Sequence, residues 1–229
     1  MKVLLVKLRG PFYSVKMLDV YQVATTLPFI PPSTLIGAIG NGLAYSGACK
    51  GINCLNKAME LVTHAREVFV KEFAVAISPI VLRRAKKVLE DKKLPRNFKE
   101  VMSYNDAMVR EYSYSPLRLV IVRVKGELEL VKKALYLMER LGDSESLVAV
   151  EEVKEVEEVK CNKTEVNTVT KLTSLEGMYT VMPSIDERGE RVMFSFPLLR
   201  VGPRYELGRI KYDRTVCAGE AIYPEGDDW

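Results

Sequence analysis

The chain has 229 residues, a formal net charge of +4, 48% hydrophobic residues and 28% charged residues. This composition is typical of one large or two small folded domains, and it excludes a disordered chain, collagen and a pure coiled coil. One histidine and one glutamine accompany 34 basic and 30 acidic residues. Scarce amides with abundant charge indicate a heat-adapted source.

The stretch from residue 20 to residue 49 carries no charge, but Pro28, Pro31 and Pro32 interrupt it. It therefore lacks the run of about 20 apolar residues that a membrane span requires. The apolar run at residues 3–6 is too short for a secretory signal. We expect a cytoplasmic protein without a membrane segment.

In chain order, the first half predicts one strand and two helices. Residues 1–9 are short, apolar and β-branched, as in a strand. Residues 34–46 predict a helix with Ser33 or Thr34 as its N-cap. Residues 52–64 predict a second helix, because apolar residues recur at helical spacing. These residues are Ile52, Leu55, Met59 and Val62.

The next segments predict strands at residues 67–77, 117–124 and 147–153, with a helix between the last two at residues 128–141. Gly142 is placed to cap the end of that helix. One face of the helix is strongly apolar, being formed by Leu128, Val131, Ala134, Leu135, Met138 and Leu141.

This order of strands and helices predicts an α+β fold with a ferredoxin-like domain at residues 1–160. Residues 80–116 are an insertion between its second and third strands, longer than a hairpin turn needs. Residues 161–229 are read as a small β-rich C-terminal region with a hairpin turn at residues 186–189.

The charges are strongly segregated along the chain. Residues 83–99 carry 8 basic and 2 acidic side chains, a net of +6, and residues 143–158 carry 1 basic and 7 acidic, a net of −6. A third block, 200–214, has a net charge of +3. Basic blocks with tyrosines nearby favour nucleic acid, because cations neutralise phosphates and aromatic rings stack on unpaired bases. The alternative is that these blocks are solvated faces.

Few residues of the sequence suit acid–base catalysis, metal binding or cofactor binding. The only histidine, His64, is expected at a helix end, where the helix dipole stabilises its charged form. Four cysteines form no C-x-x-C pair, so we expect no metal and free thiols, with a Cys49–Cys54 or other disulfide as the alternative. The glycines of residues 37–42 do not match a dinucleotide or phosphate-loop motif, and close packing of that helix on the sheet is expected.

Four segments carry a resemblance to a known family. They are LRGPF at residues 8–12, PFIPPSTLIGAI at 28–39, REYSYSP at 110–116 and LGDSESL at 141–147. The second is similar to the P-P-S-T-L-x-G-A pattern of the CRISPR-associated family-five proteins of the RAMP superfamily. The chain resembles the archaeal type I-A branch most closely, because its C-terminal β-region is short.

The resemblance implies a subunit of the Cascade surveillance complex that caps the 5′ handle of the CRISPR RNA. It also implies that the insertion is a thumb-like hairpin beside the neighbouring backbone RAMP subunit, with a large subunit as a further partner. One branch of the family cleaves precursor CRISPR RNA without metal, using a Tyr-Lys-His set. This chain lacks a Lys-His pair after the insertion, so we expect no catalysis and no cofactor.

Two alternatives remain open: a metal-independent endoribonuclease that processes precursor CRISPR RNA, and an assembly protein whose acidic strip docks another subunit. The phosphate contacts are expected in the insertion, near its base, at the end of the first strand and at the start of the first helix. The residues expected to bind RNA are Arg83, Arg84, Lys86, Lys87, Lys92, Lys93, Arg96, Arg110, Tyr112, Arg9, Ser33 and Thr34.

Overall fold

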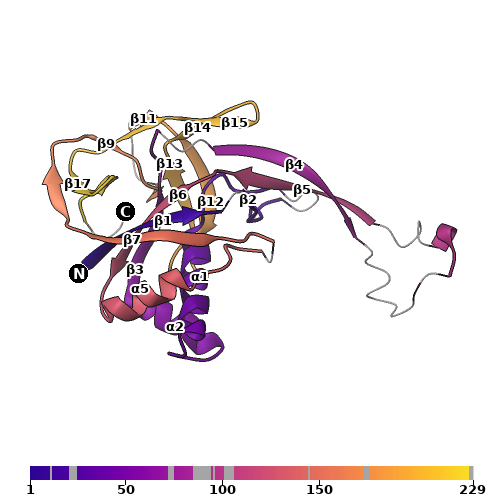
Figure 1. The fold of residues 1–229 in the computed structure, drawn as a ribbon. Coiled ribbons are helices and arrows are strands. Elements are labelled where there is room, and N and C mark those ends of the chain that lie inside the picture. The colour runs from indigo at the N-terminus through magenta and orange to yellow at the C-terminus, as the bar shows by residue number, and fades with distance from the viewer. Residues whose placement is uncertain are drawn as a thin grey trace.

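The computed structural model describes the chain apart from a set of short segments. These are residues 11, 21–24, 72–74, 85–93, 95, 101–105, 144, 173–175 and 227–228, and the side chains of residues 82–84 and 106–108. The architecture is mixed, with many strands and few helices (Figure 1).

The centre of the molecule is a four-stranded antiparallel sheet in the order β3-β6-β1-β7. Its strands are β1 (Lys2–Arg9), β3 (Val62–Val68), β6 (Arg118–Val124) and β7 (Ala149–Val156). Helices α1 (Pro32–Tyr45) and α2 (Ile52–Leu61) lie between β1 and β3 in the chain, and α5 (Leu128–Tyr136) lies between β6 and β7.

The three helices cover one face of this sheet, because β1 and β6 alternate their apolar side chains between the two faces. Leu4 and Val6 of β1 and Val120 and Val122 of β6 pack against the helices in one buried cluster. The apolar stripe predicted at residues 128–141 lies against the core: Val131, Ala134 and Leu135 of α5 and Met138 and Leu141 beyond it are buried, and Leu128 is partly buried.

The C-terminal strands cover the opposite face. Val3 and Leu5 of β1 and Ile121 of β6 form a second buried cluster with Tyr223 and Trp229. A third cluster joins C-terminal apolar residues to residues 27–29 and to the strand that follows β3. In Figure 1 the helices lie below the central sheet and most C-terminal strands above it.

The remaining strands are short, apart from β4, β5, β12 and β13. The hairpin predicted at residues 186–189 is confirmed, because Ile185 of β12 pairs with Arg191 of β13. The bounds are β2 (Phe12–Tyr13), β4 (Val75–Arg84), β5 (Asp106–Tyr114), β8 (Val159–Cys161), β9 (Glu165–Val166), β10 (Thr170–Lys171), β11 (Glu176–Met178), β12 (Thr180–Ile185), β13 (Arg191–Phe196), β14 (Leu198–Val201), β15 (Arg204–Leu207), β16 (Arg209–Lys211), β17 (Thr215–Ala218) and β18 (Ala221–Pro224).

Several predicted boundaries were wrong. The strand placed at residues 67–77 is two strands, since β3 ends at Val68 and β4 begins at Val75. His64 lies within β3 and not at a helix end. The helix placed at 128–141 ends at Tyr136, so Gly142 is not its cap.

The faces and caps of the first two helices also differ from expectation. Ser33 and Thr34 are not caps: α1 begins at Pro32, whose fixed φ suits the first helical position, and the N-cap Pro31 offers no side-chain hydrogen bond. Of the stripe expected in the core, Ile52 and Met59 are exposed, Leu55 is half-buried against the core, and Val62 is buried as the first residue of β3. The buried residues of α2 are Cys54, Ala58 and Leu61.

The cysteines form two disulfides, Cys49–Cys54 and Cys161–Cys217, so the expectation of free thiols was wrong. The first joins the turn after α1 to α2, and the second joins β8 to β17. The alternative Cys49–Cys54 pairing is present.

Two of the three glycines of α1 allow close helix packing, but the surfaces that they face differ from expectation. A Cβ on Gly40 would lie 3.2 Å from the carbonyl oxygen of Cys54 in α2, and one on Gly42 would lie 2.0 Å from that of Ala134 in α5. A Cβ on Gly37 would meet nothing within 4 Å. Gly40 and Gly42 therefore face neighbouring helices and not the sheet.

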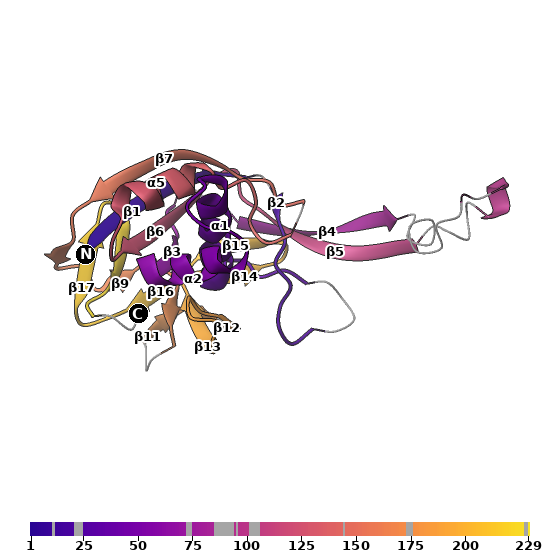
Figure 2. The ribbon, with the colours of Figure 1, turned by 90° about the horizontal axis from the view of Figure 1, so that it is seen from below.

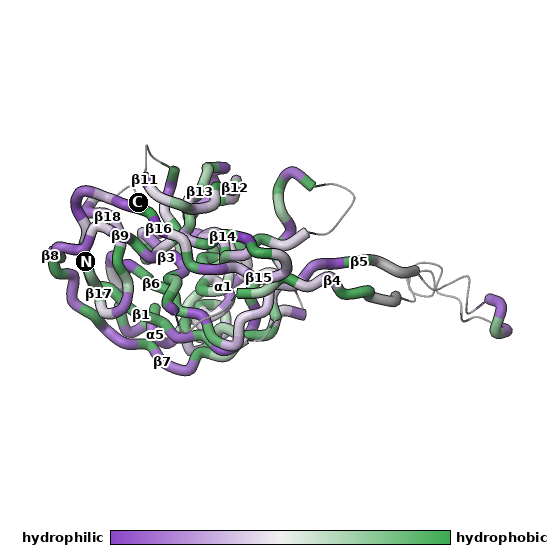
Figure 3. The backbone as a smooth tube through the Cα atoms, turned by 90° about the horizontal axis from the view of Figure 1, so that it is seen from above, coloured by the Kyte–Doolittle hydropathy of each residue, from purple (hydrophilic) through white to green (hydrophobic). Residues whose placement is uncertain are grey.

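Hydropathy along the backbone follows these layers. Figure 3 shows hydrophobic segments in the interior, while β7 forms a mostly hydrophilic strand along the rim. Within the described residues, no helix combines the length and the apolar character that crossing a membrane requires.

Candidate nucleic-acid interface

The most prominent surface feature is a long hairpin, β4–β5, which projects from the body as an arm (Figures 1 and 2). It lies in the chain between β3 and β6. Its two strands are paired from Ala76 and Tyr114 at the base to Arg84 and Asp106 further out.

The base of the arm belongs to a five-stranded sheet, in the order β14-β15-β4-β5-β2. On one side β15 pairs with Val75 and Ala76, and on the other β2 pairs with Ser113 and Tyr114. Beyond these residues β4 and β5 pair only with each other among the described strands, so the outer arm is a two-stranded ribbon.

Two of the basic residues expected to bind RNA belong to the described part of the outer arm. Arg83 and Arg84 are the last residues of β4, and their side chains are outside the described part of the chain. Lys86, Lys87, Lys92 and Lys93 lie outside the described residues. Arg96 and Lys99, further along, are exposed.

Arg110 and Tyr112 lie near the base of the arm and are engaged by acidic residues. The Arg110 Nη2 atom is 2.7 Å from Asp143 Oδ2, and its Nη1 atom is 3.9 Å from Glu145 Oε2. The Tyr112 ring is buried, and its hydroxyl donates to Glu145. Burial, with the help of the Glu145 carboxylate, raises the pKa of Tyr112 to about 12.

The loop after α5 also contacts the other sites expected to bind RNA. A Cβ on Gly142 would lie 3.9 Å from the methyl group of Thr34, in the first turn of α1. Next to the loop, Ala149 pairs with Arg9 at the end of β1. The structure therefore brings Arg9, Thr34 and Arg110 to one edge of the molecule, with Ser33 in the same helical turn.

The same loop joins the four segments that carry the family resemblance. A Cβ on Gly10, in the first segment, would lie 2.9 Å from the Leu147 carbonyl oxygen in the fourth. Thr34 belongs to the second segment and Arg110 to the third. These segments are distant in sequence and adjacent in space.

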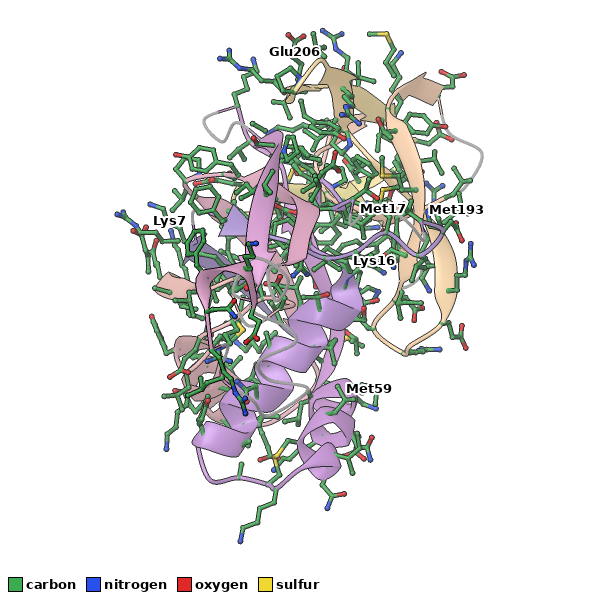
Figure 4. The ribbon with its side chains drawn as sticks, turned by 90° about the vertical axis from the view of Figure 1, so that its right-hand side faces the viewer. Lys7, Lys16, Met17, Met59, Met193 and Glu206 are labelled. Carbon is green, nitrogen blue, oxygen red and sulfur yellow. A yellow bond between two sulfur atoms is a disulfide. The ribbon has the colours of Figure 1, made fainter. Side chains whose placement is uncertain are left out.

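A cleft of about 840 Å³ lies between the central sheet and the C-terminal strands. Its lining carries five basic and three acidic side chains, so acidic groups offset part of its positive charge. Figure 4 views the molecule from the side of the arm and places Lys7 and Met193 on opposite flanks of the body. The charged residues of the cleft are Lys7, Lys71, Lys154, Lys163, Arg209, Glu152, Glu165 and Glu220.

The acidic block at residues 143–158 is largely neutralised by the fold. Five of its seven acidic side chains lie within ion-pair distance of a basic side chain from elsewhere in the chain, so the strip offers less free charge than its sequence indicates. These pairs are Asp143 and Glu145 with Arg110, Glu151 with Lys7 and Arg9, Glu155 with Lys2 and Lys132, and Glu158 with Arg123.

His64 lies on the edge strand β3 and lines a cleft of about 450 Å³ with Arg66, Asp186 and Glu187. Its residue is 7% exposed, and its ring stacks on Trp229 with the ring centroids 4.8 Å apart. Among the described residues, no group of histidine, cysteine, aspartate or glutamate side chains is arranged to hold a metal ion.

Comparison with known proteins gives consistent results across the chain. A family model described as CRISPR-associated protein (Cas_Cas5) matches residues 3–224. A CRISPR-associated protein Cas5 of Thermoproteus tenax is 39% identical over 227 residues, which are 98% of each chain. A CRISPR-associated protein Cas5 of Methanocaldococcus jannaschii is 33% identical over 189 residues, which are 78% of this chain and 73% of that one.

The fold is also similar to a crystal structure of a CRISPR protein from Archaeoglobus fulgidus, with a TM-score of 0.54, 16% sequence identity and 97% of both chains covered. The family expected from the four segments is confirmed by the family model and by the two Cas5 relatives. This chain belongs to the CRISPR-associated Cas5 family.

Proposed function

We propose that this protein is a non-catalytic RNA-binding subunit of a type I-A Cascade complex, in which it holds the 5′ handle of the CRISPR RNA. The observation that carries the proposal is the arm. It projects from the body, and the segment of +6 net charge at residues 83–99 begins at the end of β4. A projecting basic hairpin can follow a phosphate backbone that a flat surface contacts only in part.

The strand order supports a ferredoxin-like centre. Four antiparallel strands in the order β3-β6-β1-β7, with helices on one face, match a split β-α-β arrangement. We assign residues 1–160 to this domain and residues 161–229 to the C-terminal region, which covers the other face. The arm would then lie beside the neighbouring backbone RAMP subunit, with the large subunit as a further partner.

The RNA-binding role is tested by charge removal on the arm. Each phosphate contact contributes about 0.7 to the slope of log affinity against log salt for single strands. We expect Arg83→Ala/Arg84→Ala to weaken binding of repeat RNA and to reduce this slope by about 1.4. The matched control, Lys50→Ala/Lys57→Ala, removes the same charge near α2 and should leave the slope unchanged. Equal slopes in wild type and arm variant would remove these residues from the RNA site.

Incubation of the purified protein with repeat RNA in the presence of a chelator separates binding from catalysis. The buried, stacked position of His64 supports a non-catalytic role. We expect the RNA to remain intact and His64→Ala to bind it as the wild type does. Cleavage at one position that is lost in His64→Ala would instead establish a metal-independent endoribonuclease.

A further inference from the structure

The arm is held at the point where it leaves the five-stranded sheet. A two-stranded ribbon is marginally stable in water and does not fix its own direction. The direction of the arm must therefore be set by contacts at its base. Residues 110–112 of β5 occupy this position, just beyond the residues that pair with β2.

One face of β5 is held by the loop that follows α5. Arg110 forms its ion pair with Asp143 at 2.7 Å, and both side chains are less than one-fifth exposed. The Arg110 Nε–H also donates to the Ser14 hydroxyl at 3.0 Å. Two residues along the strand, and so on the same face, the Tyr112 hydroxyl donates to Glu145.

The loop is itself held in place. The Ser146 hydroxyl donates to Asp143, and the backbone N–H of Ser14 donates to the Ser146 hydroxyl at 3.1 Å. The Asp143 carboxylate is therefore fixed by one neighbour while it pairs with Arg110. A partly buried ion pair with this support is stronger than an exposed pair between flexible side chains.

The other face of β5 is held by a different segment. Glu111 points away from Arg110 and Tyr112, because side chains alternate along a strand. Its carboxylate accepts a hydrogen bond from the backbone N–H of Thr26 at 3.3 Å. The Glu111 carbonyl oxygen, which lies in the plane of the sheet, accepts a hydrogen bond at 2.9 Å from the same Ser14 hydroxyl that Arg110 contacts. Residues 110–112 are thus held by side-chain contacts on both faces of the strand.

We infer that Asp143, Glu145 and Ser146 form a clasp that sets the direction of the arm, and that Arg110 is a positioning residue held by this clasp. The guanidinium lies against two carboxylates, so a phosphate could reach it only by displacing them. The consequence for RNA binding rests on the proposed function, whereas the hold on the arm does not.

Hydrogen–deuterium exchange on the RNA-free protein tests the clasp. Arg110→Gln and Asp143→Asn each remove the ion pair, and Glu157→Gln removes one exposed acidic charge from the same block as a control. We expect amides of residues 106–111 to exchange about tenfold faster in both clasp variants, with β1 and β6 unchanged and the control like wild type. Unchanged exchange in the arm, or faster exchange in β1 and β6 as well, would overturn the inference.

RNA binding distinguishes positioning from direct contact. If Arg110 binds a phosphate, Asp143→Asn should tighten binding by freeing it, and Arg110→Gln should lower the salt slope by about 0.7. If Arg110 positions the arm, both variants should weaken binding, the slope should stay unchanged, and the double variant should be no weaker than either single one. Absence of RNA binding by the wild type would contradict the proposed function and leave the exchange test of the clasp intact.

Discussion

Replacing Gly42 with alanine probes the contact between α1 and α5. The new Cβ would lie 2.0 Å from the carbonyl oxygen of Ala134 and 2.7 Å from its carbonyl carbon. Both atoms belong to the backbone of α5, so a side-chain rotation cannot relieve the clash. The two helices would have to move apart, and their shared buried cluster with the sheet would loosen.

The magnitude follows from two opposing effects. Alanine in place of glycine favours the helix by about 1 kcal/mol, whereas forcing extra volume into a packed core costs about 1–3 kcal/mol and occasionally more. The clash at Gly42 is with a rigid neighbour, so we take the upper end of that range. We expect Gly42→Ala to lower the free energy of unfolding by about 2 kcal/mol, which is about 4–8 °C in Tm.

The same helix offers its own controls. A Cβ on Gly37 would meet open space. Gly37→Ala should therefore show only the higher helix propensity of alanine and raise Tm by about 2–4 °C. Gly40→Ala, with contacts at 3.2–3.4 Å, should fall between the two. Thermal melts followed by circular dichroism measure the series. A rise in Tm for Gly42→Ala, or equal shifts for all three variants, would refute the packing argument.

Two further predictions concern the disulfides and a buried tyrosine. Replacing both cysteines of Cys161–Cys217 by alanine should lower the free energy of unfolding, measured with urea, by about 4 kcal/mol. The same replacement at Cys49–Cys54 should lower it by about 2 kcal/mol, because that disulfide closes a far shorter loop. Equal losses would contradict this account. The pKa of Tyr112 is raised to about 12 in the folded chain, against about 10 in the unfolded chain. The contribution of this shift to the free energy of unfolding is therefore complete below a pH of about 10 and is lost as the pH rises toward 12. Tyr112→Phe should therefore lose less Tm than wild type between pH 9 and 11, and identical alkaline profiles would contradict the shift.

Continuous apolar runs made some elements predictable from sequence. The strand at residues 117–124 was found in this way, whereas the helix at 34–46 was found from the prolines and the small polar residues before it. The start of β3 was misplaced because the helical spacing of apolar residues continued to Val62, so residues 62–64 were assigned to the preceding helix. Arg66 and Glu67, which are charged, gave no local sign of a buried strand. In the fold both are buried and paired with distant residues: Arg66 with Glu187 at 3.0 Å, and Glu67 with Arg118 at 2.6 Å. No local pattern reveals such compensation, and the strand was placed five residues too late.

In the candidate site, too, the features with a contiguous sequence signal were predictable and those that depend on distant partners were not. The charge of residues 83–99 indicated a basic excursion, because its signal is contiguous in the chain. The contacts of Arg110 and Tyr112 with acidic residues were not accessible from sequence, because these partners follow about 30 residues later across a strand and a helix. The acidic block 143–158 suggested a free surface for the same reason, since its counterions come from β1, β5, β6 and α5.

The pairing of β4 with β15 has a consequence for how the chain is made. Val75 of β4 pairs with Tyr205 of β15. The edge of β4 that faces β15 therefore stays unpaired until a strand 205 − 75 = 130 residues later has been synthesised. At about 5–20 residues per second, that delay is about 7–26 s on the ribosome. During this interval β4 presents unpaired backbone groups that other nascent chains could pair with. The base of the arm is therefore completed late in synthesis, after the helices and central strands that precede it are available to fold.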